Sequence, residues 1–204
     1  MIPTKPTETD LQSLAIVKDL AFQEKRPFTS ASRSVAEIQK VYEKYLKTYP
    51  RKLEHCRVIK DDSSGSVIGF IQLQMSGDVG DLSFPSEMRH KLLPGEAYVE
   101  VIACHPDHTG KGIGSKLLQW AFSYCEESGV KFLSLDVMTA NKGAVRLYER
   151  KGFVSKPDPH ADFCETIWAP LCIFCFLGCR YCSLTYMEKS FPTSAGAVPM
   201  NMSR

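Results

Sequence analysis

The sequence predicts an α/β fold within one domain. An apolar run typical of a buried strand at 98–104 leads through a glycine-rich loop into an amphipathic helix at 113–125. A second strand at 131–137 leads into a second helical pattern that begins after Asn141. Strands and helices that alternate in this way favour an α/β architecture. A length of 204 residues is enough to bury one hydrophobic core.

The N-terminal half predicts two helices and a β-hairpin. A short strand at 2–5 precedes a helix over 11–21, capped by Thr9 or Asp10. Ser34 caps a second helix, whose apolar stripe runs from residue 38 to residue 46. Strands at 56–60 and 66–75 flank the polar turn DDSSG, whose residues are typical of hairpins. A longer loop follows at 76–95.

The loop that follows the strand at 98–104 has glycine at every second position. Gly110, Gly112 and Gly114 have no Cβ atoms to keep a ligand away from the backbone, and glycine tolerates a positive φ in a tight turn. The first N–H groups of the next helix point outward, with the positive end of the helix dipole behind them. The pattern therefore predicts a loop that binds an anion such as a phosphate.

Residues 141–153 predict a helix whose two ends are both specified. Asn141 is a good N-cap, and one helix face carries Ala144, Leu147 and Tyr148. The basic pair at 150–151 lies at the negative end of the helix dipole, and Gly152 stops the helix. Strands at 153–156 and 181–189 complete the predicted pattern.

The spacing of the glycines identifies the loop more closely. Neither G-x-G-x-x-G nor G-x-x-x-x-G-K-S/T fits residues 110–115. Residues 109–114 (TGKGIG) instead resemble motif A of the GNAT superfamily of acetyl-CoA-dependent N-acetyltransferases, Q/R-x-x-G-x-G/A. Residues 141–153 resemble the family's motif B, N-x-x-A-x-x-L-Y-E-x-x-G-F. Thr109 departs from motif A, because the family usually has Arg or Gln there.

The resemblance covers residues 2–190 and implies an α/β (α+β) GNAT fold, with a mixed, mostly antiparallel central sheet flanked by helices. It implies one N-acetyltransferase domain over 1–190, and the composition of 191–204 predicts a disordered tail. It also implies acetyl-CoA as cosubstrate. The residues that would bind this cosubstrate are Ile102, Ala103, Cys104, Thr109, Gly110, Lys111, Gly112, Ile113, Gly114, Ser115, Asn141, Ala144 and Tyr148.

The activity that the resemblance implies is transfer of acetyl to a primary amine, on a small molecule or a peptide, by direct attack in a ternary complex. An amine with a pKa of about 10 is mostly protonated at neutral pH, so one group must take its proton and another must protonate the leaving thiolate. Family members often use a Tyr of the motif B helix for the second task, and Tyr148 stands at that place. The alternative is that Tyr148 only packs against the coenzyme.

The candidate general bases are Glu100 and Tyr98. Period-two alternation predicts that one strand face carries Tyr98, Glu100, Ile102 and Cys104. Glu100 is favoured, since partial burial raises the pKa of a carboxyl group toward neutrality. The alternative is that Glu100 pairs with a cation and that solvent takes the proton. His105 and His108 are expected to be solvated loop residues.

Residues 158–180 form a hydrophobic insert that the family pattern lacks, and five of the eight cysteines lie between 164 and 182. The spacing of the last four resembles a zinc site. These cysteines have no distal partner pair, so we favour an apolar element packed over the domain and no metal site. A surface for a partner or a membrane is the other alternative. The rival function is therefore a catalytically inactive acyl-CoA-binding or docking module.

The charge and composition of the chain restrict its partners. A formal net charge of +2 with mixed signs gives no reason to expect nucleic-acid binding. The N-terminal residues lack the apolar core of a signal peptide, and no apolar run is long enough for a transmembrane span. We therefore expect a cytoplasmic protein with an amine acceptor. A homodimer is compatible with the sequence but is not indicated by it.

Overall fold

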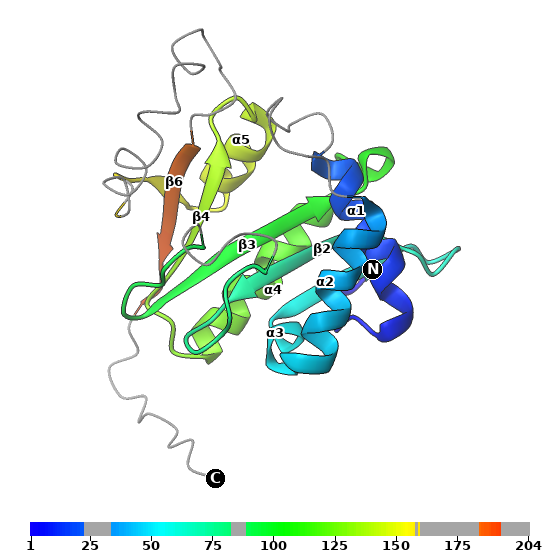
Figure 1. Cartoon of the computed structure of the whole chain (residues 1–204). Helices are drawn as coiled ribbons and strands as arrows, with labels where there is room; N and C mark the ends of the chain where they lie inside the picture. Colours follow the sequence, from blue (N-terminus) through cyan, green and yellow to red (C-terminus); the bar gives the residue numbers. More distant parts are fainter. Residues whose placement is uncertain (23–33, 83–88, 158, 160–183, 193–204) are drawn as a thin grey trace, which may run out of the picture.

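The computed structural model describes residues 1–22, 34–82, 89–157, 159 and 184–192, which form a six-stranded sheet with helices on both faces (Figure 1). The strands are β1 (Cys56–Lys60), β2 (Val67–Gln74), β3 (Glu96–Cys104), β4 (Phe132–Met138), β5 (Val154–Ser155) and β6 (Leu184–Ser190). The α-helices are α1 (Leu11–Phe22), α2 (Val35–Thr48), α3 (Pro50–Glu54), α4 (Ile113–Glu127) and α5 (Lys142–Arg150). Short 3₁₀ turns, η1 (Glu8–Asp10) and η4 (Pro106–His108), precede α1 and follow β3.

The strand order is β1-β2-β3-β4-β6-β5. Of the pairs between these strands, β3 and β4 are parallel, and the other neighbours are antiparallel. This is the mixed, mostly antiparallel sheet that the motifs predicted. The helix α4 connects the two parallel strands, as a parallel pair requires a crossover connection.

The parallel strands β3 and β4 stay together for a short distance only. Their register pairs Glu96 with Phe132, Ala97 with Leu133, and Tyr98 with Ser134, and the pairing ends there. Beyond this point each strand keeps its other neighbour: β3 remains paired with β2 and β4 with β6. Figure 1 shows the two ribbons diverging from that point. One backbone edge of β3 and the facing edge of β4 are thus left without a strand partner.

A β-bulge lies directly beyond the divergence. Leu73 of β2 pairs with Val99, whereas Gln72 pairs with Val101, so Glu100 is the extra residue on β3. An unpaired residue of this kind bends the strand and increases its twist. The bulge therefore accompanies the turn of β3 away from β4.

The sheet separates two hydrophobic clusters. One, between the sheet and α4 with α5, includes Val99, Ile113 and Leu117. The other, between the sheet and α1 with α2, includes Leu14, Tyr42, Phe70, Val101 and Ala103. In Figure 1 α1 and α2 lie in front of the sheet and α4 lies behind it.

Several helix signals act as predicted. Ser34 caps α2: its hydroxyl accepts the backbone N–H of Glu37, and the Glu37 carboxylate accepts the Ser34 N–H in return. Gly152 has a φ of +86° and ends α5. At the start of α1 the predicted cap is wrong. Thr7 begins the turn that precedes α1, and Asp10 is the reciprocal acceptor of the Thr7 N–H.

Two expectations about the first sixty residues also need correction. The strand expected at 2–5 is reduced to a single bridge, in which Thr4 and Val58 exchange backbone hydrogen bonds. The helix α3 was not predicted, since five residues are too few to show a periodic pattern.

The rest of the C-terminal expectations lie largely outside the described residues. These include residues 181–183 of the last predicted strand, the cysteine-rich insert with its zinc alternative, and most of the tail. No helix in the described ranges is long and apolar enough to cross a bilayer. The domain limits 1–190 and the tail at 191–204 stay predictions.

Gly69 allows β2 to approach α4, and its substitution tests this packing. A Cβ at Gly69 would lie 2.5 Å from Ile113 Cγ2 and 3.2 Å from the carbonyl oxygen of Ala103. Because backbone lies on one side, we expect Gly69→Ala to lower the free energy of unfolding by about 1–3 kcal/mol. Gly143→Ala is the control, since the nearest atom to its Cβ is 3.9 Å away. It should stabilise α5 by up to about 1 kcal/mol. Equal effects of both variants in urea unfolding would contradict this packing.

Candidate active site between β3 and β4

The glycine loop, residues 109–115, joins η4 to α4 and holds two glycines in the left-handed region. Gly110 has a φ of +81° and Gly112 a φ of +77°, and Gly112 is the N-cap of α4. A Cβ added at either would meet no atom within 4 Å, so the space above the loop is open. The two glycines therefore serve the turn and leave the backbone accessible, as the sequence predicted.

The glycine loop also has N–H groups to offer. The first helical hydrogen bond of α4 runs from Lys116 N–H to the Gly112 carbonyl oxygen, at 3.1 Å. Within the described chain, no hydrogen bond uses the backbone N–H groups of Gly110, Gly112, Ile113 and Ser115. These groups lie at the positive end of the α4 dipole. Their number and direction suit an anion with several oxygens, such as a pyrophosphate.

Gly114 has a different role from the other two glycines. It lies inside α4, and a Cβ there would lie 3.1 Å from Leu147 Cδ2 of α5. Its missing side chain lets α5 pack against the first turn of α4. The two sequence motifs, which are separated by a strand in the chain, therefore meet at this contact.

The helix α5 begins and packs as its sequence predicted. The Asn141 side chain accepts the Ala144 N–H at 3.4 Å, which confirms the N-cap. Ala144, Val145 and Leu147 pack at the border of the α4 cluster, and Tyr148 is buried in it. The Tyr148 ring contacts Phe153 edge to face, with centroids 5.7 Å apart.

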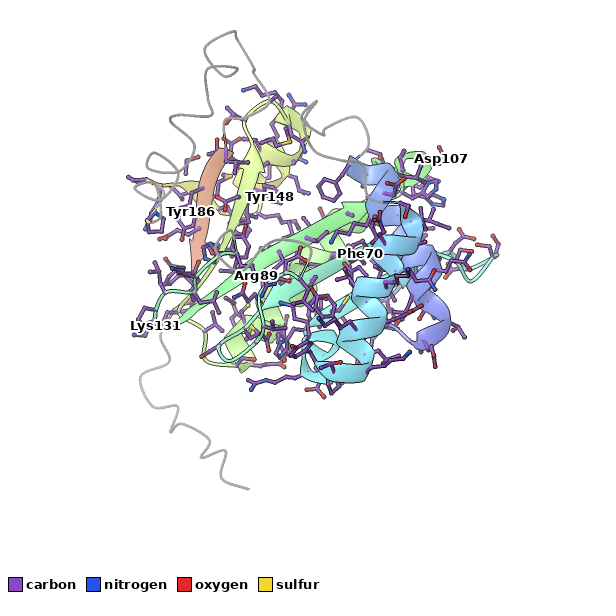
Figure 2. All side chains as sticks on the ribbon, viewed as in Figure 1. Phe70, Arg89, Asp107, Lys131, Tyr148 and Tyr186 are labelled. Atoms are coloured by element: carbon purple, nitrogen blue, oxygen red, sulfur yellow. The ribbon has the colours of Figure 1, made fainter. Side chains whose placement is uncertain are left out.

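Tyr148 lies beside the divergence of the strands. Figure 2 shows its label between the ribbons of β3 and β4, with Tyr186 on the far side of β4. Burial raises the pKa of the Tyr148 phenol, so this group stays protonated at neutral pH. Its hydroxyl makes no hydrogen bond to the described part of the chain. Tyr148 therefore has a proton to donate and no internal acceptor for it.

The remaining residues of the loop are exposed or partly exposed. Thr109 and Lys111 are exposed, and Thr109 donates its N–H to the Pro106 carbonyl oxygen. His105 is partly exposed, as expected, and its ring lies edge-on to His108, with centroids 5.7 Å apart. The expectation for His108 is wrong in part, because its Nδ1 atom is buried and unpaired within the described chain.

The last residues of β3 form the open edge beside the glycine loop. Ile102, Ala103 and Cys104 pair with β2 on one side and have no β4 partner on the other. An extended ligand with amide groups can hydrogen-bond to such an edge as an added strand does. The sulfur of Cys104 is a free thiol, and burial raises its pKa to about 11.

The bulge overturns one expectation about β3. Tyr98, Glu100, Ile102 and Cys104 do not share a face. Ile102 and Cys104 pack on the α4 side, with Val99. Glu100 contacts α3 on the opposite side. The extra residue at the bulge shifts the alternation by one, so residues an even number apart change sides.

Glu100 is buried and paired. Its Oε1 lies 2.5 Å from Nζ of Lys52, which α3 places beneath the sheet. Burial raises the pKa of Glu100 to about 7, while Lys52 opposes the rise. Glu100 thus combines both readings of the sequence: it pairs with a cation, and its carboxyl group titrates near neutrality.

Tyr98 belongs to a second polar group, at the last paired position of β3 and β4. Its hydroxyl donates to Oδ2 of Asp136 at 3.1 Å, and its ring stacks on His90 with centroids 3.9 Å apart. His90 in turn contacts the carboxylate of Glu96, which also accepts the hydroxyl of Ser134. Burial and the Asp136 carboxylate raise the pKa of Tyr98.

Sequence reasoning missed three partners at this site. Lys52, His90 and Asp136 lie in segments that gave no motif, and each reaches the site through a contact distant in sequence. The LSLDV pattern of β4 could have indicated Asp136, as a lone carboxylate within an apolar strand. Within the described ranges, no group of three or more His, Cys, Asp and Glu side chains could hold a metal ion.

Comparison with known proteins identifies the arrangement. The family model described as "Acetyltransferase (GNAT) family" matches residues 19–153. An uncharacterised N-acetyltransferase of Methanocaldococcus jannaschii is 29% identical over 123 residues, which cover 57% of this chain and 53% of the relative. The ribosomal protein bS18 alanine N-acetyltransferase of Escherichia coli is 40% identical over 58 residues, which cover 28% of this chain and 39% of the relative. The chain thus spans about half the length of the first relative.

A solved structure supports the same fold. The PaiA N-acetyltransferase from Thermoplasma acidophilum, crystallised with coenzyme A, aligns with a TM-score of 0.58 at 19% identity. The alignment covers 93% of this chain and 98% of that one. At this identity the likeness establishes the fold.

Acetyl-CoA is the acetyl donor of this family, and the glycine loop fits its pyrophosphate. We expect Gly112→Trp to abolish acetyl-CoA binding in titration calorimetry, because the indole would fill the open space above the loop. Gly129→Trp is the matched control: Gly129 also has a positive φ, at +69°, and also has no atom within 4 Å of an added Cβ. Both variants carry similar backbone strain, but Gly129 follows the other end of α4. Normal binding by Gly112→Trp would refute the assignment of the loop.

Proposed function

Since the chain belongs to the GNAT acetyltransferase family, we propose that it transfers acetyl from acetyl-CoA to a primary amine by direct attack within a ternary complex. The observation that carries this proposal is the open edge of β3, which ends beside a glycine loop with unused N–H groups. One feature would hold an extended amide-bearing chain and the other its pyrophosphate.

In this proposal acetyl-CoA lies along β3. Ile102, Ala103 and Cys104 pair with its pantetheine amides. The glycine loop, from Thr109 to Ser115, binds the pyrophosphate with its backbone N–H groups, so the missing Arg or Gln at position 109 costs one side-chain contact only. On α5, Asn141, Ala144 and Tyr148 close the site. A backbone N–H of β3 polarises the thioester carbonyl.

Proton transfer is assigned to Glu100 and Tyr148. The acceptor amine loses a proton to the Glu100 carboxylate, directly or through a bridging water, and its nitrogen forms a bond to the acetyl carbon. The carbon–sulfur bond then breaks, and Tyr148 returns a proton to the thiolate. The products are an amide and CoA with a free thiol. Tyr98 is the second candidate base, since its hydroxyl could pass a proton to Asp136.

Peptide amines are the acceptors to test first. The Escherichia coli relative is, by its name, an alanine N-acetyltransferase of a ribosomal protein. Carboxylates also outnumber lysines on the α1 side of β3, where Asp81, Glu100 and Asp136 accompany Lys18 and Lys52. This balance favours a positively charged amine over an acidic acceptor. We place this reaction in the cytoplasm.

A second candidate function is an acyl-CoA-binding module without activity, which the departure at Thr109 favours. Such a module would bind acetyl-CoA and release no thiol with any acceptor. The assay is therefore CoA release from acetyl-CoA with three probes: a peptide with a free N-terminal alanine, an N-terminally blocked peptide with one lysine, and spermidine. The proposal expects release with at least one probe. Binding without release would establish the inactive module.

The role of Tyr148 can be separated from its packing. Tyr148→Phe keeps the ring and its contact with Phe153, and the hydroxyl has no partner in the described chain to lose. We expect kcat to fall by about 10²-fold or more, the usual loss for a proton donor, with little change in the KM for acetyl-CoA.

Tyr124→Phe, in the middle of the α4 surface, is the control for this substitution and should retain kcat. A Tyr148→Phe variant with the kcat of the unaltered protein would show that Tyr148 only packs against the coenzyme.

A further inference from the structure

Lys52 is buried where a lysine is costly. Its side chain is 1% exposed and that of Glu100 is 3% exposed, with 2.5 Å between Nζ and Oε1. An unpaired charge in such a place destabilises a protein strongly, so each of these groups depends on the other. The pair lies at the bulge, two residues beyond the last contact of β3 with β4.

The surroundings hold the Lys52 ammonium in one position. The helix α3 begins at Pro50, and Gln72 of β2 donates from Nε2 to the Lys52 carbonyl oxygen at 2.8 Å. The Lys52 Nζ lies 6.0 Å from the centroid of the Tyr45 ring, within cation–π range. Backbone and side chain are therefore both fixed, and Glu100 receives its cation from a rigid element.

Few other charges act on Glu100. Lys18 of α1 favours the ionised carboxylate, and Asp81, in the segment after β2, disfavours it. The other titratable groups that interact with Glu100 are Tyr42, Tyr45, Cys56 and Tyr98, from α2, β1 and β3. Burial raises the pKa of each of these four groups, so they are neutral near pH 7. Lys52 is thus the nearest cation to Glu100.

We propose that Lys52 is a positioning residue for acetyl transfer: its ammonium fixes the Glu100 carboxylate at the bulge in the ionised state that accepts the proton of the amine. This inference rests on the proposed function and adds a residue to it. Lys52 touches neither the acceptor nor acetyl-CoA in this account. It acts through Glu100 alone.

The pH dependence of kcat/KM tests this role. Glu100 accepts a proton only when ionised, so kcat/KM should fall as the pH drops below about 7, the pKa of Glu100, and level off above it. In Lys52→Met the carboxylate loses its cation, its pKa rises, and the acidic limb should move up by about 1–3 pH units. At pH 7 this shift corresponds to a loss of about fivefold or more. The acceptor is the best probe of the CoA-release assay.

A double variant isolates the coupling. Glu100→Gln should lower kcat/KM by about 10²-fold or more and remove the limb. In that background Lys52→Met should change neither kcat nor the pH profile, since Lys52 has no carboxylate to act on. The double variant also removes both buried charges, so it remains assayable where either single variant fails to fold. Acetyl-CoA binding in titration calorimetry reports the folded state of each protein.

Lys60→Met is the matched control. Lys60 also pairs with a carboxylate, Asp10, at 2.7 Å, but that pair lies at the start of α1. Its loss should leave the acidic limb in place.

The outcomes separate this inference from the proposed function. A double variant that folds and keeps the original limb would overturn the role of Lys52, as would a single Lys52→Met variant with an unshifted limb. If the unaltered protein neither binds acetyl-CoA nor releases CoA with any probe, the proposed function fails and this inference fails with it. An active protein whose limb is independent of Glu100 refutes the inference alone.

Discussion

The loss of pairing between β3 and β4 after Tyr98 and Ser134 is the constraint on which the candidate site depends. Backbone N–H and C=O groups inside a protein need hydrogen-bond partners, and a sheet that opens in its middle leaves some without them. The bulge at Glu100 accompanies this opening, and both strands keep their outer neighbours. The open edge of β3 can therefore accept an extended ligand without any change in the rest of the sheet.

The helices that follow the two strands give this opening its chemistry. The helix α4 begins with N–H groups that no described residue uses, and α5 places a protonated Tyr148 beside the divergence. Contact between Gly114 and Leu147 fixes the two helices to each other. The opposite face of the sheet carries the buried carboxylates, with Glu100 held by Lys52. Anion binding and proton transfer are thus assigned to opposite faces of the same strand.

The local parts of this arrangement could be predicted from the sequence, and the non-local parts could not. Glycine spacing predicted the loop before α4, and Asn141 and Gly152 predicted both ends of α5, because caps and turns depend on neighbouring residues. The faces of β3 were predicted wrongly, since the bulge depends on pairing with β2. Lys52 was missed because its role comes from a carboxylate 48 residues away. The family motifs carried the fold, and they cover none of these contacts.

The most direct test of the account is hydrogen exchange of the backbone amides, measured by mass spectrometry with and without acetyl-CoA. The account predicts slower exchange in two segments when acetyl-CoA is added: residues 99–104 of β3 and residues 110–115 of the glycine loop. Exchange in β1, on the far side of β2, should stay unchanged. Binding of acetyl-CoA that left both segments unprotected would contradict the account, because the ligand would then lie elsewhere on the protein.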